Sequence, residues 1–386
     1  MKILLYHWKA YSDRFLEHNL QAMGHEVNVW SNDAVMQDKE SALFFLENEL
    51  KKGYDVVFSY NYFKMIAIVC HTKGIPYIAW TQDSPMLGMY DHTALFETNY
   101  FFCFDYEQCE RMKQSGSKHV FYCPLATDVF SMQKTVDFCT EKEKNTYRAG
   151  ISFVGSLYTE RDMWSDLSGM PEFLKGYFDG IVETQLRLPM LRFSQAGIPF
   201  DVMKKIQQVL DFKGLEDSSV SYEELIDNLI DRQVTVMERR KMIQLLEGRT
   251  NFKLYTRSDT SIYPKVNNCG TVDYYTEMPK VFKHSDINLN VTLRSIRSGI
   301  PLRVLDVIAA GGFLLTNVQP ELELFFKEGE SIATFQSLEE MDEKIDFYLA
   351  NDSARKRIIE NGYRIVENQF DFKVRLPQIF EMAGLS

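Results

Sequence analysis

The sequence predicts an α/β protein built from two doubly wound domains, and three observations lead to this fold class. Short apolar runs alternate with helical stretches that stop at glycine, which is the pattern of parallel βαβ units. One polar and charged stretch interrupts the alternation, which then resumes. The length of 386 residues suits two domains of ordinary size better than one.

The first domain is predicted over residues 1–134. Its strands are the apolar runs Lys2–Tyr6, Val27–Trp30, Asp55–Ser59, Pro76–Trp80, Tyr100–Phe104 and Val120–Tyr122. The helices Asp13–Met23, Ser41–Lys52 and Phe63–Lys73 each end at a glycine. Because the connections between strands are helical, the strands are expected to run parallel, with ligands binding beyond their carboxyl ends.

Residues 135–148 are polar and charged and are interpreted as a linker. The second domain is predicted over residues 149–370. Its strands are Ile151–Val154, Phe252–Thr256, Asp286–Val291 and Phe313–Thr316, and its later helices are Leu338–Ala350 and Ser353–Glu367. Residues 371–386 are expected to form a C-terminal helix, for which packing back on the first domain is an open alternative.

A helical insertion is predicted within the second domain, over about residues 164–248, because strand candidates are scarce there. Its candidate helices are Phe173–Leu188, Asp201–Leu210, Tyr222–Ile230 and Thr235–Leu246. Amphipathic stripes of this kind most often serve as core, so a structural role is the simpler interpretation.

Composition excludes several classes of protein. Hydrophobic residues make up 45% of the chain and charged residues 25%, which permits a buried core. The formal net charge of −11 argues against a broad nucleic-acid-binding face. No apolar run approaches the roughly 20 residues that cross a bilayer, and the opening residues indicate a buried strand instead of a signal peptide. Scattered cysteines without a Cys-x-x-Cys pair indicate reduced thiols of a cytoplasmic protein and no metal site.

The densest chemistry lies in Asn288–Asn317. A predicted strand there runs into a loop of arginines and small residues: Arg294, Arg297, Ser298 and Gly299. Pro301 then suits the first turn of a helix, where its missing N–H costs nothing. Free backbone N–H groups at a helix N-terminus, together with arginines, suit a diphosphate.

Arg303 and Asp306 are three positions apart and therefore share a face of this helix. Arg303 is expected to reach a phosphate while Asp306 accepts from ribose hydroxyls. The alternative is an ion pair on the helix surface, which contributes little to stability. Gly311 and Gly312 follow the helix and are interpreted mainly as its stop.

The chain resembles the CgeB-like spore-maturation glycosyltransferases of bacteria. The resemblance is carried by SGIPLRVLDVIAAGGFLLTN, QPELELFF and EGESIATFQSLEEM in the second domain. AWTQDSP, FFCFD and HVFYCPLATD are similar to the domain of unknown function (DUF3880-like) often fused to it. The resemblance implies a GT-B fold: two Rossmann-like domains facing a cleft, the donor on the second, and no required metal or other cofactor.

One position departs from the pattern of related enzymes. Many retaining GT-B enzymes carry two Glu residues separated by seven positions at this helix, and the second holds the donor ribose. The resemblance gives that role to Asp306, whereas Ser298 stands where the first acid would fall. The stereochemical outcome of transfer therefore stays open.

Further donor contacts are expected at other strand ends of the second domain. Gly155 and Ser156 follow its first strand, and Arg161 comes shortly after. By resemblance, Tyr274 lies near the nucleotide base, and Glu321 approaches the donor sugar. For each of these, an ordinary turn or packing role is the competing interpretation.

In the first domain, Asp83 follows a buried strand and precedes a Pro-stiffened turn. A carboxylate there is a candidate general base for an acceptor hydroxyl, or it bonds its own downstream backbone in an Asx turn. His7, after the first strand, is a weaker candidate base.

These observations predict a hexosyltransferase that moves sugar from a nucleoside diphosphate sugar, with a UDP-sugar favoured, to a hydroxyl of a protein or glycan. Two alternatives stay open: a nucleotide-sugar epimerase on the same fold, and a non-catalytic nucleotide-sugar-binding partner of a glycosylation complex. The sequence does not identify the sugar, the acceptor or the oligomeric state.

Overall fold

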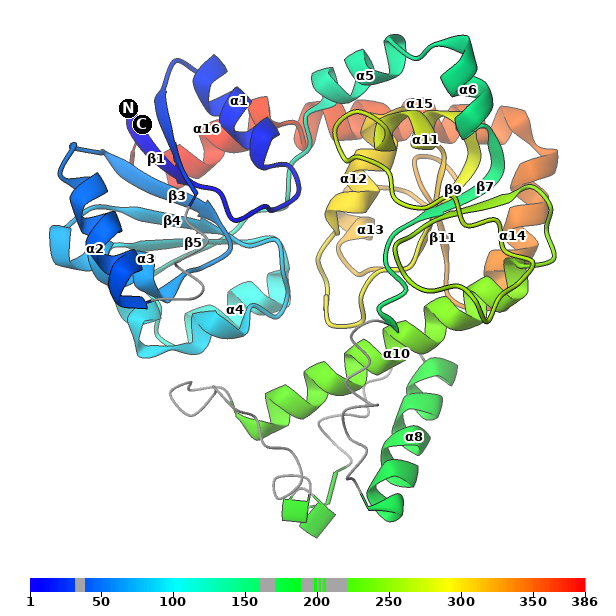
Figure 1. Ribbon diagram of the computed structural model, residues 1–386, viewed down its shortest axis with the longest axis horizontal. Coiled ribbons are helices and arrows are strands. Elements are labelled where there is room, and N and C mark those ends of the chain that lie inside the picture. Colours follow the sequence, from blue (N-terminus) through cyan, green and yellow to red (C-terminus); the bar gives the residue numbers. More distant parts are fainter. Residues whose placement is uncertain are drawn as a thin grey trace.

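The computed structural model describes residues 1–31, 39–159, 171–188, 198–199, 201–202, 204–205 and 221–385. Two parallel β-sheets form separate domains that lie side by side (Figure 1). Within the described residues, no helix is long and apolar enough to cross a membrane.

The first domain contains a six-stranded sheet of order β2-β1-β3-β4-β5-β6. Its strands are β1 (Lys2–Tyr6), β2 (Glu26–Trp30), β3 (Val56–Tyr60), β4 (Tyr77–Trp80), β5 (Asn99–Cys103) and β6 (His119–Tyr122). The connecting elements are α1 (Asp13–Ala22), α2 (Lys39–Leu50), α3 (Lys64–Lys73), η2 (Leu87–Tyr90), η3 (His92–Leu95) and α4 (Tyr106–Gln114). All strand pairs are parallel, as the sequence predicted.

Helices cover both faces of this sheet. Ile3 and Leu5 point into one hydrophobic cluster with α1, whereas Leu4 and Tyr6 point into a second cluster with α2, α3 and α4. Alternate residues of a strand face opposite sides, so a strand buried on both faces reads as a continuous apolar run. This is why the strands were recognisable in the sequence.

The second domain contains a five-stranded sheet of order β11-β10-β9-β7-β8. Its strands are β7 (Ala149–Val154), β8 (Phe252–Tyr255), β9 (Ser285–Asn290), β10 (Leu314–Asn317) and β11 (Ala333–Phe335). Its helices are α8 (Glu172–Arg187), α10 (Tyr222–Leu246), α11 (Met278–His284), α12 (Leu302–Ala309), α13 (Leu322–Phe325), α14 (Leu338–Ala350) and α15 (Asp352–Gln369). The double glycine does end α12: Gly311 has φ 72°, and a Cβ on Gly312 would lie 2.6 Å from the Phe282 carbonyl oxygen.

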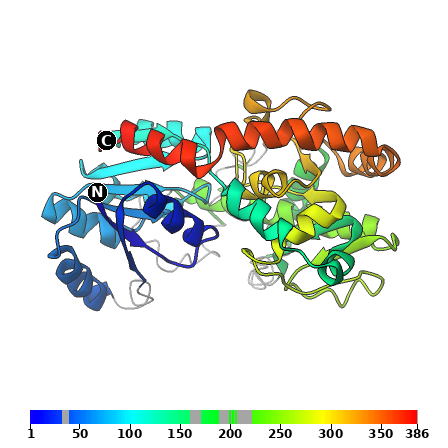
Figure 2. The same ribbon diagram turned by 90° about the horizontal axis from the view of Figure 1, so that it is seen from above.

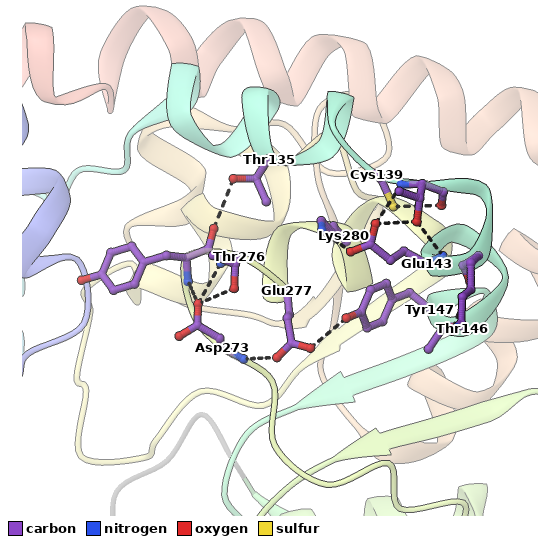
Figure 3. Close-up of polar contacts among 12 residues, drawn as sticks. Thr135, Cys139, Glu143, Thr146, Tyr147, Asp273, Thr276, Glu277 and Lys280 are labelled. Atoms are coloured by element: carbon purple, nitrogen blue, oxygen red, sulfur yellow. Dashed lines mark hydrogen bonds and ion pairs between the residues drawn. The ribbon is translucent and has the colours of Figure 1, made fainter.

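The segment between the domains is helical and docked on the second domain. It carries the end of α5 (Val129–Asp137) and all of α6 (Glu141–Tyr147). Figure 3 shows its contacts: Lys280 Nζ lies 2.5 Å from Glu143 Oε1, and the Tyr147 hydroxyl donates to Glu277 at 2.9 Å. Residues 135–148, interpreted as a linker, are thus fastened along α11.

The chain crosses between the domains a second time near its C-terminus. α15 lies along the second domain, and α16 (Phe372–Met382) lies on the first (Figure 2). The two crossings lie side by side: the Thr127 N–H donates to the Phe370 carbonyl at 2.9 Å, and the Phe372 N–H donates back to Thr127 at 3.3 Å. These paired segments form the hinge between the domains.

The helical insertion contains one long helix where two were predicted. The prediction of separate helices at Tyr222–Ile230 and Thr235–Leu246 is wrong, because α10 runs unbroken for 25 residues. It begins with a capping box of Ser221 and Glu224, and no Gly or Pro interrupts it. Much of the predicted helix Asp201–Leu210 lies outside the described residues, as do residues 164–170 of the insertion.

All six cysteines are free thiols, and five of them are buried.

Candidate functional site

Four polar residues follow neighbouring strands of the first sheet. His7 follows β1, Asn61 follows β3, Asp83 lies beyond the end of β4, and Asp105 lies beyond the end of β5. These strands are adjacent in the order β1-β3-β4-β5. Since they are parallel, their carboxyl ends meet at one edge of the sheet, where ligands bind in folds of this type.

Asp83 is exposed and is held by Asn61. The Asn61 Nδ2 donates to Asp83 Oδ2 at 2.8 Å, and Asn61 Oδ1 accepts from the backbone N–H of Gln82 at 2.8 Å. The Asp83 carboxylate makes none of the downstream backbone bonds of an Asx turn among the described residues. Asn61 escaped sequence reasoning, although a polar residue directly after a buried strand was a usable signal.

His7 is half-buried on the same edge. Its Nε2 lies 4.0 Å from Glu17 Oε2, and this nitrogen has no hydrogen-bond partner among the described residues. Burial lowers the pKa of His7. The ring is therefore neutral near pH 7, in the form that accepts a proton.

The second domain presents a turn at the end of β7. The Gly155 N–H donates to the Tyr255 carbonyl at 3.0 Å, and Ser156 Oγ accepts from the Tyr158 N–H at 2.8 Å. The turn lies beside Ser258, which follows the neighbouring strand β8. Arg161, the third residue predicted here, lies outside the described residues.

Arg239 of α10 reaches this turn and was missed by sequence reasoning. Its guanidinium donates to the Ser156 carbonyl at 2.5 Å and to the Val291 carbonyl at 2.6 Å. It lies over the Tyr158 ring, 4.8 Å from the centroid. The side chain is buried, which lowers its pKa, and no carboxylate of the described residues pairs with it. Because Arg239 is far in sequence from the strand ends that it contacts, no local sequence pattern indicated this contact.

Arg303 is a second cation without a carboxylate partner among the described residues. It is half-buried in the first turn of α12, with its guanidinium 5.2 Å from the Phe282 ring centroid and one nitrogen 2.6 Å from Met278 Sδ. Its positive charge acts to lower the pKa of both Arg239 and Asp306, so it lies near both side chains. Two arginines of like charge in one region, neither paired with an acid, favour an anion between or beside them.

The other two predicted arginines are paired with carboxylates of α10. Arg294 Nε donates to Glu238 at 2.8 Å. Arg297 lies 3.1 Å from Asp231 and 3.8 Å from Asp227, and its side chain is 10% exposed. These ion pairs hold the loop before α12 against the insertion. Carboxylates of α10 thus neutralise the two arginines that were predicted to bind a diphosphate.

Asp306 is 1% exposed and bonded from both domains. Its Oδ1 accepts from the Thr127 hydroxyl at 2.9 Å and from the Tyr274 hydroxyl at 3.1 Å. Burial raises the pKa of Asp306 to about 6, and Arg303 partly offsets the rise. The predicted ribose and base contacts, Asp306 and Tyr274, thus lie together, at the hinge between the domains.

Ser298 and Gly299 touch the first domain. The Arg297 N–H donates to Asp105 Oδ2 at 2.7 Å, and Ser298 Oγ lies 2.7 Å from Asp105 Oδ1. A Cβ on Gly299 would lie 2.9 Å from the Phe104 ring, so only glycine fits this approach. Glu321 joins the contact, since its Oε1 lies 2.6 Å from Ser298 Oγ.

A cavity of about 420 Å³ lies between the two domains. One wall is the loop that contains Asp83; the others are α10, Tyr158 and the loop at 293–296. This volume falls in the usual range of small-molecule sites, roughly 300–1,000 Å³. A neighbouring cavity of about 160 Å³ shares Leu293 and Ile296 and is lined by Arg294 and Arg297.

Sequence comparison gives a match that covers the later part of the second domain and nearly all of α16. Residues 232–381 match the model of a family described as glycosyl transferase-like. An uncharacterized protein of Aquifex aeolicus (strain VF5) is 22% identical over 239 residues. That match covers 61% of this chain and 59% of the relative, so it spans less than two thirds of the relative's length.

Solved structures resemble the whole chain. Sucrose-phosphate synthase from Thermosynechococcus elongatus superposes with a TM-score of 0.60 at 10% identity, covering 100% of this chain and 98% of that one. Anabaena Alr3699/HepE in complex with UDP-glucose gives 0.59 at 10% identity, covering 100% and 99%. An Escherichia coli trehalose-6-phosphate protein bound with UDP-2-fluoro glucose gives 0.55 at 11% identity, covering 99% of each. The chain has the GT-B fold, with two Rossmann-like domains, as predicted.

Proposed function

We propose that this GT-B protein, whose residues 232–381 match a glycosyl transferase-like family, transfers a hexose from a nucleoside diphosphate sugar to a hydroxyl acceptor. A UDP-sugar is the favoured donor, and no metal or other cofactor is required. The acceptor is a protein or glycan, and the enzyme works in the cytoplasm. Support comes from the structural relatives described above, which include complexes with UDP-glucose and UDP-2-fluoro glucose.

The single observation that carries this proposal is the position of Arg239. A buried guanidinium that pairs with no described carboxylate stands at the carboxyl ends of β7 and β9, beside the Gly155–Ser156 turn. Arg303 lies in the same region. We assign the donor diphosphate to these two arginines, with Arg294 and Arg297 positioning the loop before α12.

The reaction needs charge stabilisation at the leaving group. The acceptor oxygen bonds to the anomeric carbon, and the bond from that carbon to the diphosphate breaks, with its electron pair passing to the diphosphate. Preorganised cations that meet developing charge provide the largest catalytic contribution in many enzymes. Arg239 and Arg303 supply them here, and Tyr274 and Asp306 are assigned to the nucleoside.

The acceptor proton is assigned to Asp83. This carboxylate lines the interdomain cavity and is oriented by Asn61. A general base must lie within hydrogen-bond reach of the proton it takes, and Asp83 faces the second domain across the cavity. His7 is kept as the second candidate base.

A thermal-shift screen with UDP-, GDP- and dTDP-sugars tests the donor assignment. A ligand that binds the native state raises the melting temperature by mass action. We expect UDP-sugars to stabilise the protein and to be consumed when a hydroxyl acceptor is added. Stabilisation without consumption would favour a binding partner, conversion of the sugar without an acceptor would favour an epimerase, and no stabilisation by any nucleotide sugar would refute the proposal.

A further inference from the structure

The insertion helix α10 forms a wall of the interdomain cavity with one of its faces. The lining residues on α10 are Asn228, Leu229, Arg232, Gln233 and Val236. Positions four apart lie one above the other on a helix, so these residues form a continuous stripe. The opposite wall is the first-domain loop at 82–88. The insertion therefore shapes the same cavity that contains Asp83.

α10 is held in this position from both sides. Glu224 near its start forms an ion pair with Arg111 of α4 in the first domain. Further along, Asp231 and Glu238 pair with the arginines of the loop before α12. Its last turns bury Met242, Ile243 and Leu246 against the second sheet. Contacts with both domains therefore hold α10, which runs below the two domains in Figure 1.

Three amides line the cavity, together with the hydroxyls of Ser84 and Ser295 and the charged Asp83 and Arg232. Asn228 and Gln233 project from α10 and are half-buried, and the structure gives neither side chain a hydrogen-bond partner among the described residues. Gln82 and Asp83 face them from the loop. An amide both donates and accepts, as a sugar hydroxyl does, so this set matches a ligand with several hydroxyls.

Apolar groups fill the rest of the lining. Leu229 and Val236 of α10 face Met86 and Leu87 of the loop, and Tyr158 closes one side. Such surfaces suit the C–H faces of a sugar ring and an apolar substituent. A cavity of about 420 Å³ is large enough for a small ligand.

We infer that this cavity is the acceptor site and that the acceptor, of the two classes proposed above, is a small carbohydrate with an apolar substituent, recognised by the stripe of α10 that lines the cavity. The inference rests on the proposed transferase function. It adds that the helical insertion, otherwise a structural element, selects the acceptor. Asn228 and Gln233 bond its hydroxyls, Leu229 and Val236 contact its apolar part, and Asp83 takes the proton of the reacting hydroxyl.

The test compares acceptors and cavity variants on the full chain. UDP release from the stabilising UDP-sugar is measured with octyl glycosides of several hexoses and with Ser- and Thr-containing peptides. We expect turnover with an octyl glycoside and none with peptides. Leu229→Trp should raise the acceptor KM at least tenfold, and Gln233→Ala, which adds no bulk, at least threefold. UDP affinity by calorimetry should stay unchanged in both.

Gln244→Trp is the matched control, because Gln244 is exposed on α10 away from the cavity. It should leave the acceptor KM unchanged. Turnover with peptides alone, or an unchanged acceptor KM in both Leu229→Trp and Gln233→Ala, would overturn the acceptor assignment while wild-type UDP binding preserved the donor assignment. Absence of UDP-sugar binding by the wild type would overturn both.

Discussion

Ser298 of the second domain joins Asp105 of the first, with its Oγ 2.7 Å from Asp105 Oδ1. The same Oγ lies 2.6 Å from Glu321 Oε1. A hydroxyl carries one proton and can donate to only one of the two acids. The two acids therefore compete for one hydroxyl proton. Burial raises the pKa of Glu321, and hydrogen bonds from Ser298, Tyr122 and the Tyr106 N–H partly offset the rise.

Two variants of Glu321 test this arrangement. Glu321→Gln keeps the shape of the side chain and one oxygen for the Tyr122 hydroxyl, but it cannot accept at both carboxylate positions, where Oε1 takes the Tyr106 N–H at 2.7 Å. It should therefore cost about 1 kcal/mol of unfolding free energy. Glu321→Ala leaves buried polar groups without a partner and should cost about 3 kcal/mol. Urea unfolding measures both. Equal losses would show that the hydrogen bonds of Glu321 do not hold this contact together.

Arg303→Ala should weaken UDP binding at least tenfold, a loss of about 1.4 kcal/mol. The reason is that Arg303 is half-buried, has no carboxylate partner among the described residues, and is assigned to the diphosphate. Isothermal calorimetry with UDP measures the effect. Arg187→Ala is the control, since Arg187 is exposed on α8 and pairs with Glu183. Unchanged affinity in Arg303→Ala would remove this residue from the donor site.

Arg239→Lys tests the second cation with its charge retained. The guanidinium bonds two carbonyls at once, whereas an ammonium has no fork to do so. We expect UDP affinity to fall about tenfold, with the melting temperature measured in parallel to separate binding from folding. If the variant binds UDP with wild-type affinity, Arg239 only stabilises the conformation of the Gly155–Ser156 turn and does not contact the donor.

Asp83→Asn should leave UDP affinity intact and reduce transfer at least a hundredfold, in line with the usual contribution of a general base. Asn keeps the size of the side chain but cannot take a proton. Calorimetry and acceptor turnover are measured on the same preparation. Transfer near the wild-type rate would make Asp83 a turn residue, and His7→Gln would then be the next variant to assay.

Asp13→Asn should make stability less dependent on pH. Asp13 is 5% exposed, and burial raises its pKa to about 7, with the backbone N–H groups of Ala10 and Lys9 partly offsetting the rise. A raised carboxyl pKa means that the folded state binds the proton more tightly than the unfolded state does. The contribution of Asp13 to the free energy of unfolding therefore falls as pH rises from about 4 to 7. The free energy of unfolding of the variant should exceed that of the wild type by on the order of 1–3 kcal/mol at pH 8, and by less at pH 5. Equal gains at both values would exclude Asp13 as the titrating group.

The fold was predictable because both sheets are buried on two faces. Strands such as β3, with every residue buried, read as uninterrupted apolar runs, and glycines such as Gly74 marked the ends of helices. α10 was the main error. The polar residues in its middle resemble a loop between two helices. One of them, Asp231, forms an ion pair with the distant Arg297, and no local sequence pattern reveals that contact.

The candidate site was predictable where it follows strand ends or lies on the helix after Pro301, as Arg303 and Asp306 do. Asp83 and Gly155 lie where the alternation of strands and helices placed them. Arg239 and Asn61 depend on which distant segments meet, since Arg239 comes from the insertion and reaches the ends of β7 and β9. The pairing of Arg294 and Arg297 with α10 was hidden for the same reason.

The paired crossings at Thr127 and Phe370 have a thermodynamic consequence for ligand binding. Two backbone hydrogen bonds join these segments, so both crossings hold the domains together at the same place. Thr127 also donates its hydroxyl to Asp306, the residue assigned to the donor nucleoside. A nucleotide that bonds to Asp306 would compete with the Thr127 hydroxyl, so nucleotide binding and this interdomain hydrogen bond would weaken each other reciprocally. Nucleotide binding to the second domain would then change the contact of that domain with the first.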